Sequence, residues 1–151
     1  MRHNVITQIE EKEIKSLKGL AVLDLAQNNI KDVTHVAKNC RKLKELYLMS
    51  NKIVSISEKF YIWLKDLEHL HLSGNPITEL HPNIRKMTHL KVLGISFTKI
   101  KQLPSSIVEL NFIERLLVEN TPLVVLVIPA FYRNRNFPAP KEACKPSRRT
   151  S

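Results

Sequence analysis

Apolar residues recur along this chain in one repeated pattern, which is clearest between Leu67 and Ile77. That segment reads L-x-x-L-x-L-x-x-N-x-I, with varied residues between the leucines and one asparagine near the end. The first apolar residue of each copy falls at 20, 43, 67, 90 or 113, so the period is 23 or 24 residues. A fixed period of this length predicts a solenoid of stacked repeats. The four other copies fit without a gap: Leu20/Leu23/Leu25/Asn28/Ile30, Leu43/Leu46/Leu48/Asn51/Ile53, Leu90/Leu93/Ile95/Thr98/Ile100 and Ile113/Leu116/Val118/Thr121/Leu123.

Each repeat is predicted to contain a short strand followed by a turn. The second and third apolar positions lie two residues apart, which places them on one face of a strand. The asparagine follows at the turn, where its amide can both donate to and accept from backbone groups. Five such copies in register resemble the leucine-rich repeat proteins, and the resemblance covers about residues 4 to 131.

The resemblance implies an α/β fold, a right-handed β-α superhelix with a short concave parallel sheet of about five strands. Short helices or 3₁₀ segments would form its convex side. In this family the asparagines form a ladder from repeat to repeat, which is implied here for Asn28, Asn51 and Asn75. Thr98 and Thr121 take that position in the last two repeats. Because a hydroxyl can do only part of the work of an amide, we expect the last two turns to be held less tightly.

The second half of each repeat returns the chain to the next strand. From Ile100 to Leu110 it reads I-x-x-L-P-x-x-I-x-x-L, which is similar to the return of the intracellular, Ras-signalling-related group of these proteins. Pro104 would suit the first turn of a short helix or 3₁₀ segment, because its missing N–H costs little there.

The repeats divide the chain into three predicted parts. Residues 4–20 align with the second half of a repeat, with Ile6 matching Ile53. Residues 1–19 are therefore a partial repeat, as in the C-terminal portion of a longer array, or alternatively a helical cap with a capping box from Thr7 to Glu10. Residues 20–131 hold the five repeats with a hydrophobic C-terminal cover from residue 124 to about 132. Residues 132–151, rich in Pro, Lys, Arg and Ser, are expected to form a disordered basic tail.

Composition and charge bear on location and partners. The formal net charge is +10, and half of it comes from the tail, where six cationic side chains stand against Glu142 alone. A basic balance favours anionic partners, but no aromatic stripe accompanies it, so we do not expect a nucleic acid partner. Two distant cysteines, Cys40 and Cys144, suggest neither a disulfide framework nor a zinc site. We find no secretory signal and no apolar run of the roughly 20 residues that a membrane span needs, so we predict a cytoplasmic location.

The variable strand positions are expected to face the concave side, which in this family usually holds the partner. Tyr47, Met49 and Phe97 are large apolar groups where solvent is expected, which is typical of interface anchors. The alternative is that they only cover the sheet. The predicted partner-binding residues are Asp24, Glu45, Tyr47, Met49, His69, His71, Phe97, Arg115 and Glu119.

The sequence offers little for metal binding or for catalysis. His69 and His71 share one strand face, but zinc needs three or four ligands, and the third candidate, Asp24 or Glu45, lies on another repeat. We predict contact residues there, with no metal and no cofactor. The sequence has no G-x-S-x-G, P-loop or H-E-x-x-H motif, and a shallow arc of strands offers no deep pocket. We therefore predict no catalytic residues and no small-molecule substrate.

These features predict a non-catalytic protein interaction module or scaffold, with a role in intracellular signal transduction. A small GTPase or a phosphatase subunit is the partner that family analogy suggests. One alternative is a structural component of cilia or the cytoskeleton, or an adaptor that recruits substrates to a ubiquitin ligase. Another alternative is that the chain is a fragment of a larger leucine-rich repeat protein. Binding of nucleic acid by the basic tail would be recognised by a steep dependence on salt.

Overall fold

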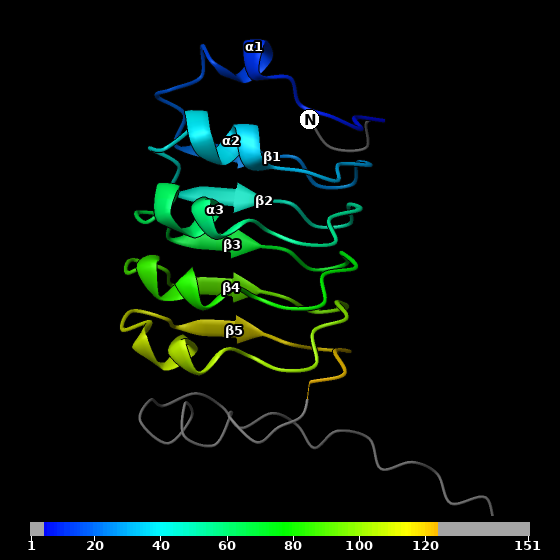
Figure 1. Ribbon diagram of the computed structural model, residues 1–151, viewed down its shortest axis with the longest axis vertical. Helices are drawn as coiled ribbons and strands as arrows, with labels where there is room; N and C mark the ends of the chain where they lie inside the picture. Colours follow the sequence, from blue (N-terminus) through cyan, green and yellow to red (C-terminus); the bar gives the residue numbers. More distant parts are fainter. Residues whose placement is uncertain (1–4, 124–151) are drawn as a thin grey trace, which may run out of the picture.

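The computed structural model describes residues 5–123, which form a stack of repeats with one strand in each (Figure 1). The predicted C-terminal cover and the predicted basic tail lie outside the described residues. Within the described range the strands are β1 (Val22–Asp24), β2 (Glu45–Tyr47), β3 (His69–His71), β4 (Val92–Gly94) and β5 (Arg115–Leu117).

The strands form one parallel sheet in the order β1-β2-β3-β4-β5. Equivalent positions of successive repeats pair directly, so that Leu46 on β2 faces Leu23 on β1 and Leu70 on β3. These central leucines are buried, and because successive strand residues point to opposite faces, their neighbours point outward. The outward-pointing side of the sheet is called the concave face below. The predicted solenoid with a five-stranded parallel sheet is confirmed.

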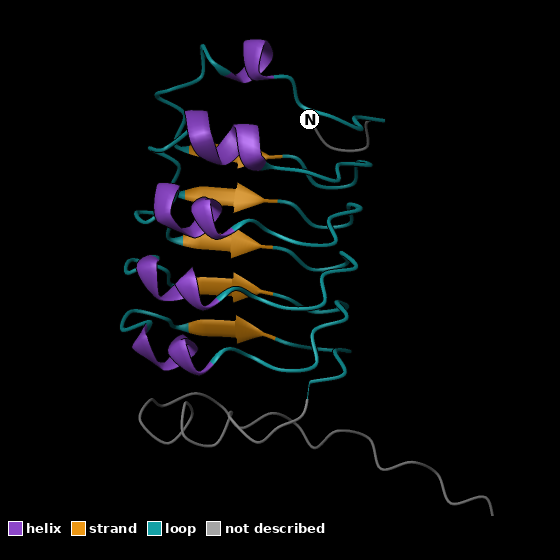
Figure 2. Cartoon of the chain, viewed as in Figure 1, coloured by secondary structure: helices purple, strands orange, loops and turns teal. Residues whose placement is uncertain are grey.

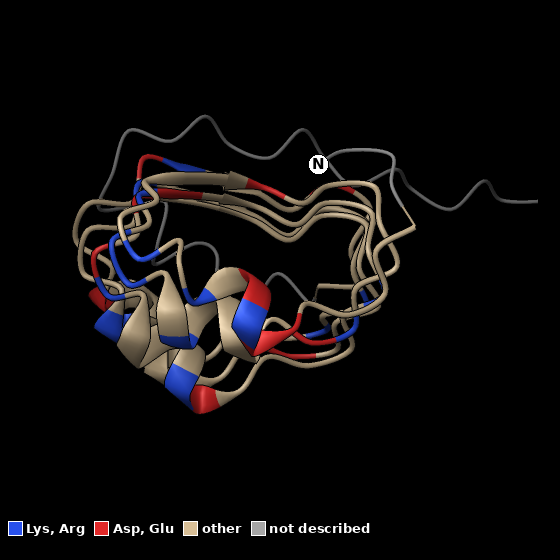
Figure 3. Ribbon diagram, turned by 90° about the horizontal axis from the view of Figure 1, so that it is seen from above, with Lys and Arg blue, Asp and Glu red and all other residues tan. Residues whose placement is uncertain are grey.

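Short helical segments lie on the opposite side of the stack from the strands (Figures 2 and 3). Pro82 is the first residue of its segment, whereas Pro104 immediately precedes the next one and does not lie in its first turn. The helices are α1 (Glu11–Ile14), α2 (Thr34–Asn39) and α3 (Glu58–Trp63), and the 3₁₀ segments are η1 (Pro82–Lys86) and η2 (Ser105–Glu109). Between the two sides lies a core of leucine, isoleucine and valine with Phe60 and Tyr61 from α3.

The segment before β1 makes the backbone contacts of a return half. The Ile6 N–H donates to Asn28 Oδ1 at 3.1 Å, as the Ile30 N–H donates to Asn51 Oδ1 at 3.0 Å. Helix α1 then begins after a capping box formed by Glu10 and Glu13. The capping box expected from Thr7 to Glu10 is wrong, because the helix begins at Glu11 and its capping box is formed by Glu10 and Glu13. The predicted division of the chain at residues 19 and 131 stays a prediction.

The buried asparagines bind the repeats together, and each reaches back to the repeat before it. Asn51 donates from Nδ2 to the carbonyl oxygens of Leu25 at 2.9 Å and Leu48 at 3.1 Å. Asn75 donates in the same way to Leu48 and Leu72, both at 2.8 Å, and its Oδ1 accepts from the Ile53 N–H. One amide therefore satisfies backbone groups of two repeats, where no strand pairing reaches them.

The threonines at the same position bond only within their own turn. Thr98 donates to the Ile95 carbonyl at 2.7 Å, and Thr121 donates to the Val118 carbonyl at 2.8 Å. Among the described residues neither hydroxyl bonds to the preceding repeat. The inter-repeat part of the ladder therefore ends at Asn75.

A row of charges with alternating sign crosses the repeats at the start of the strands. Glu68 lies between two lysines, 3.3 Å from Lys44 Nζ and 2.6 Å from Lys91 Nζ. The hydrogen bond to Glu68 raises the pKa of Lys91 above its ordinary value, and Glu114, at the equivalent position of the last repeat, acts in the same direction. Hydrogen bonds from Lys91 and then Lys44 hold the pKa of Glu68 below its ordinary value.

Replacing Glu68 with glutamine is expected to lower the free energy of unfolding at neutral pH, because both lysines lose their shared counterion. A carboxyl with a depressed folded-state pKa contributes stability above its unfolded-state pKa and loses it as pH falls through the folded-state value. The difference between the two proteins should therefore disappear in acid. Urea unfolding at low and high salt measures it, and since exposed pairs are screened, a difference that stays the same in 1 M salt, roughly a 3 Å Debye length, would contradict this assignment.

Candidate functional site

The concave face contains two rows of outward side chains that run across the strands. One row contains Val22, Glu45, His69, Val92 and Arg115, and the next contains Asp24, Tyr47, His71, Gly94 and Leu117. On β4 all three strand residues are buried, whereas the outward residues of β2 and β3 are partly exposed. Side chains from the neighbouring strands therefore lean over β4.

Tyr47 and His71 form a stacked pair at the centre of this face. Their ring centroids are 5.1 Å apart with 19° between the planes. The Tyr47 hydroxyl donates to Glu45 Oε2 at 2.6 Å, which is short and typical of a bond to a carboxylate. The three side chains come from adjacent strands and hold one another in place.

Gly94 provides the space that this pair needs. A Cβ atom at Gly94 would lie 2.9 Å from His71 Nδ1 and 3.2 Å from Ser73 Oγ. His71 therefore lies against the β4 backbone, and Tyr47 lies against His71. Burial lowers the pKa of His71 below its ordinary value, the charges of His69 and Arg115 act in the same direction, and Glu45 acts against them.

Replacing Gly94 with alanine is expected to push the His71 ring away from β4 while the fold is kept, because the clashing atom belongs to a side chain that can rotate. The ring would become more hydrated, so the pKa of His71 should rise toward its ordinary value. An NMR pH titration of the imidazole measures this change. An unchanged His71 pKa in the variant would show that the ring does not depend on Gly94 for its position.

The other predicted residues lie around this centre. Asp24 pairs in register with Tyr47 and accepts the Ala26 N–H at 3.0 Å. Met49 is partly exposed, and Arg115 and Glu119 are exposed at the β5 end of the face. Direct contacts within the face thus join Glu45, Tyr47 and His71.

Phe97 lies just beyond β4, in the turn. It is 60% exposed and has a φ of 56°, a left-handed conformation that costs a residue with a Cβ atom about 1 kcal/mol or more. Gln27, Ser50, Gly74 and Asn120 have the same conformation at the equivalent position of their repeats. A large apolar side chain held in this position by the repeat is a candidate contact residue, separate from the Tyr47 centre.

The described residues offer little for metal or nucleophilic chemistry. No three histidine, cysteine, aspartate or glutamate side chains gather there in a way that could hold a metal ion. Cys40 is buried, and burial raises the pKa of its thiol, which disfavours the reactive thiolate. No helix between residues 5 and 123 is long and apolar enough to cross a membrane.

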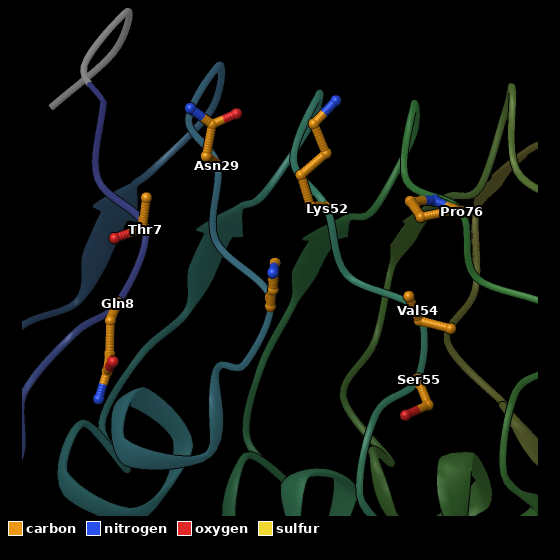
Figure 4. Close-up of a pocket in the computed structure, with 8 residues that line it drawn as sticks. Thr7, Gln8, Asn29, Lys52, Val54, Ser55 and Pro76 are labelled. Atoms are coloured by element: carbon orange, nitrogen blue, oxygen red, sulfur yellow. The ribbon is translucent and has the colours of Figure 1, made fainter.

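A groove that the sequence did not reveal lies along the segments that leave the strands (Figure 4). Its volume is about 940 Å³, and Lys31 and Lys52 are the only charged residues in its lining. The lining comes from the segment before β1 and from the next three repeats, which only the alignment of equivalent positions could have brought together: Thr7, Gln8, Asn29, Lys31, Lys52, Val54, Ser55 and Pro76.

Comparison with known families agrees with the repeat geometry. The family model described as "Leucine rich repeat" matches residues 1–53 and 41–84, and the model "Leucine Rich repeats (2 copies)" matches residues 65–111. The chain belongs to the leucine-rich repeat family. Nothing in these matches assigns this leucine-rich repeat protein to the Ras-signalling-related group.

Two curated relatives illustrate the range of similar leucine-rich repeat proteins. A probable disease resistance protein of Arabidopsis thaliana is 34% identical over 103 residues, which are 68% of this chain and 11% of that protein. Cilia- and flagella-associated protein 410 of Mus musculus is 39% identical over 82 residues, which are 52% of this chain and 32% of that protein. The chain thus spans at most about a third of these relatives' lengths.

Solved structures of leucine-rich repeat proteins share the fold. A leucine-rich repeat protein of Leptospira interrogans superimposes with a TM-score of 0.77 at 27% identity, over 85% of this chain and 32% of that one. An internalin of Listeria monocytogenes superimposes with a TM-score of 0.58 at 21% identity, over 78% of this chain and 39% of that one. Family membership and these relatives make this chain a protein interaction module in the broad sense.

Proposed function

We propose that this chain is a non-catalytic scaffold that binds a protein partner on its concave face. The observation that carries the proposal is the stacked Tyr47–His71 pair, fixed by Glu45 and by the space at Gly94. A rigid, partly exposed aromatic centre loses little conformational freedom on binding, and such residues dominate protein interfaces. The polar residues around it, Asp24, His69 and Arg115, would form the rim.

The partner and pathway follow by analogy. We propose a cytoplasmic role in signal transduction, with a small GTPase or a phosphatase subunit as the partner. The similarity to a cilia- and flagella-associated protein supports a second candidate, a structural or adaptor component of cilia or the cytoskeleton. Both functions use the same face, so they differ in the identity of the partner.

The test compares wild type with the triple variant Tyr47→Ala, His71→Ala, Phe97→Ala in affinity capture from the source cells with mass spectrometry. The captured partner is then purified, and its affinity for both proteins is measured by calorimetry. Loss of two or three anchor residues at about 1–2 kcal/mol each predicts at least about thirtyfold weaker binding.

The matched control is Ile62→Ala, Val108→Ala, Phe112→Ala, which removes exposed apolar side chains, one of them aromatic, away from the concave face. It should bind as wild type does. Equal affinity of the concave variant and wild type, with both folded by circular dichroism, would refute the proposal.

A further inference from the structure

Two acidic groups of the concave face, Asp24 and Glu45, lie at its β1–β2 end, whereas the third, Glu119, lies at the β5 end. Asp24 on β1 and Glu45 on β2 flank Tyr47, since Asp24 pairs with it in register and Glu45 accepts its hydroxyl. The cation of this face, Arg115, lies on β5, three strands from β2. A partner that meets the β1–β2 end therefore meets two negative charges beside one aromatic ring.

These groups are fixed before any partner binds. His71 rests against the β4 backbone at Gly94 and supports the Tyr47 ring, and the Tyr47 hydroxyl orients the Glu45 carboxylate. A carboxylate has about four lone-pair sites, so Glu45 can accept further hydrogen bonds while it holds the phenol. Asp24, Glu45 and Tyr47 are each partly exposed.

An aromatic face flanked by carboxylates matches one kind of side chain. A guanidinium group is planar, stacks on aromatic rings and donates two parallel hydrogen bonds to a carboxylate. An ammonium group can satisfy the charge but not the paired geometry. We propose that Asp24, Glu45 and Tyr47 form a recognition site for an arginine side chain of the protein partner. This inference rests on the proposed function, whose partner it specifies chemically.

The neighbouring His71 gives the site a dependence on pH. His69 and His71 on β3 lie next to the site, and β4 contributes no titratable side chain. Arg115 on β5 and Glu119, two residues after β5, lie beyond β4. Protonation of the His71 imidazole adds positive charge beside the bound guanidinium. Arginine binding should therefore weaken as the pH falls through the pKa of His71, which burial lowers below its ordinary value.

The test is an NMR titration of the full chain with the peptide Gly-Ser-Arg-Arg-Ser-Gly. The same peptide with citrulline in place of arginine removes the charge and keeps the shape, and a lysine version keeps the charge alone. We expect shifts at Asp24, Glu45 and Tyr47, and an affinity order of arginine above lysine above citrulline. Glu45→Gln should weaken the arginine peptide about tenfold, whereas Glu79→Gln, which makes the same chemical change on an exposed return segment, should have less than about a twofold effect.

The outcomes separate this inference from the proposed function. Equal weakening by Glu45→Gln and Glu79→Gln, or citrulline binding as tightly as arginine, would overturn the arginine site. If the concave triple variant still loses its captured partner in that case, the proposed function stands and only the chemistry of the partner is wrong. If the triple variant keeps its partner, the proposed function fails independently of the peptide result.

Discussion

Replacing Asn51 with alanine is expected to lower the free energy of unfolding by roughly 3 kcal/mol, because a buried polar group that loses its partner costs ~1–3 kcal/mol. The amide donates to the carbonyls of Leu25 and Leu48 and accepts the Ile30 N–H. Its loss leaves backbone groups of two repeats without a partner. Water cannot readily replace the amide there, because Asn51 is only 3% exposed. Urea unfolding followed by circular dichroism measures the change.

The matched control is Asn39→Ala. Asn39 lies at the end of α2 and makes one side-chain bond, from Nδ2 to the His35 carbonyl at 2.9 Å, within its own helix. We expect its replacement to cost about 1 kcal/mol or less. If both alanine variants unfold at the same urea concentration, the asparagine ladder does not hold the repeats together as described.

Replacing Thr98 with asparagine is expected to raise the free energy of unfolding by about 1–2 kcal/mol, through two added inter-repeat hydrogen bonds. The Leu25 carbonyl already accepts from both Asn28 and Asn51, so the Leu72 carbonyl can accept from a new amide as well as from Asn75. The Ile77 N–H, which makes no hydrogen bond among the described residues, would donate to the new Oδ1 as Ile53 donates to Asn75.

Thermal or urea unfolding of the Thr98→Asn protein checks this expectation, with Thr98→Val as the control. Valine has a similar shape but loses the bond to the Ile95 carbonyl, so that variant should be less stable than wild type. A Thr98→Asn protein no more stable than wild type would mean that the last repeats are too far apart for the amide to bridge.

The features of the fold that depend on the repeat period could be predicted from the sequence. Because the repeats have nearly equal lengths, equivalent residues pair across the sheet, and the positions of the central leucines and of the buried Asn28, Asn51 and Asn75 follow from the alignment alone. Thr98 and Thr121 each make one hydrogen bond within their own turn, as the chemistry of the hydroxyl suggested, and the looser hold on these turns stays a prediction. None of this required knowledge of side-chain orientation.

The parts that were not predicted depend on how particular side chains lean. The Tyr47–Glu45 bond was available as a signal, because residues two apart on a strand share a face. The contact between His71 and Gly94 could not be predicted from the sequence, since it depends on the direction in which the imidazole ring tilts. Lys44, Glu68, Lys91 and Glu114 occupy the same position in successive repeats. Their alternating charges could therefore have been found by comparing that position along the sequence.

The inter-repeat hydrogen bonds of the asparagines make some junctions between repeats harder to open than others. Each amide ties its own repeat to the one before it, and this tie is missing where Thr98 and Thr121 stand. In a solenoid each repeat contacts only its neighbours, so local opening starts at the weakest junction. The β4 and β5 repeats should therefore separate first. His71 would then lose the contact with Gly94 that positions its ring, so opening of this junction should also weaken binding at the Tyr47 centre.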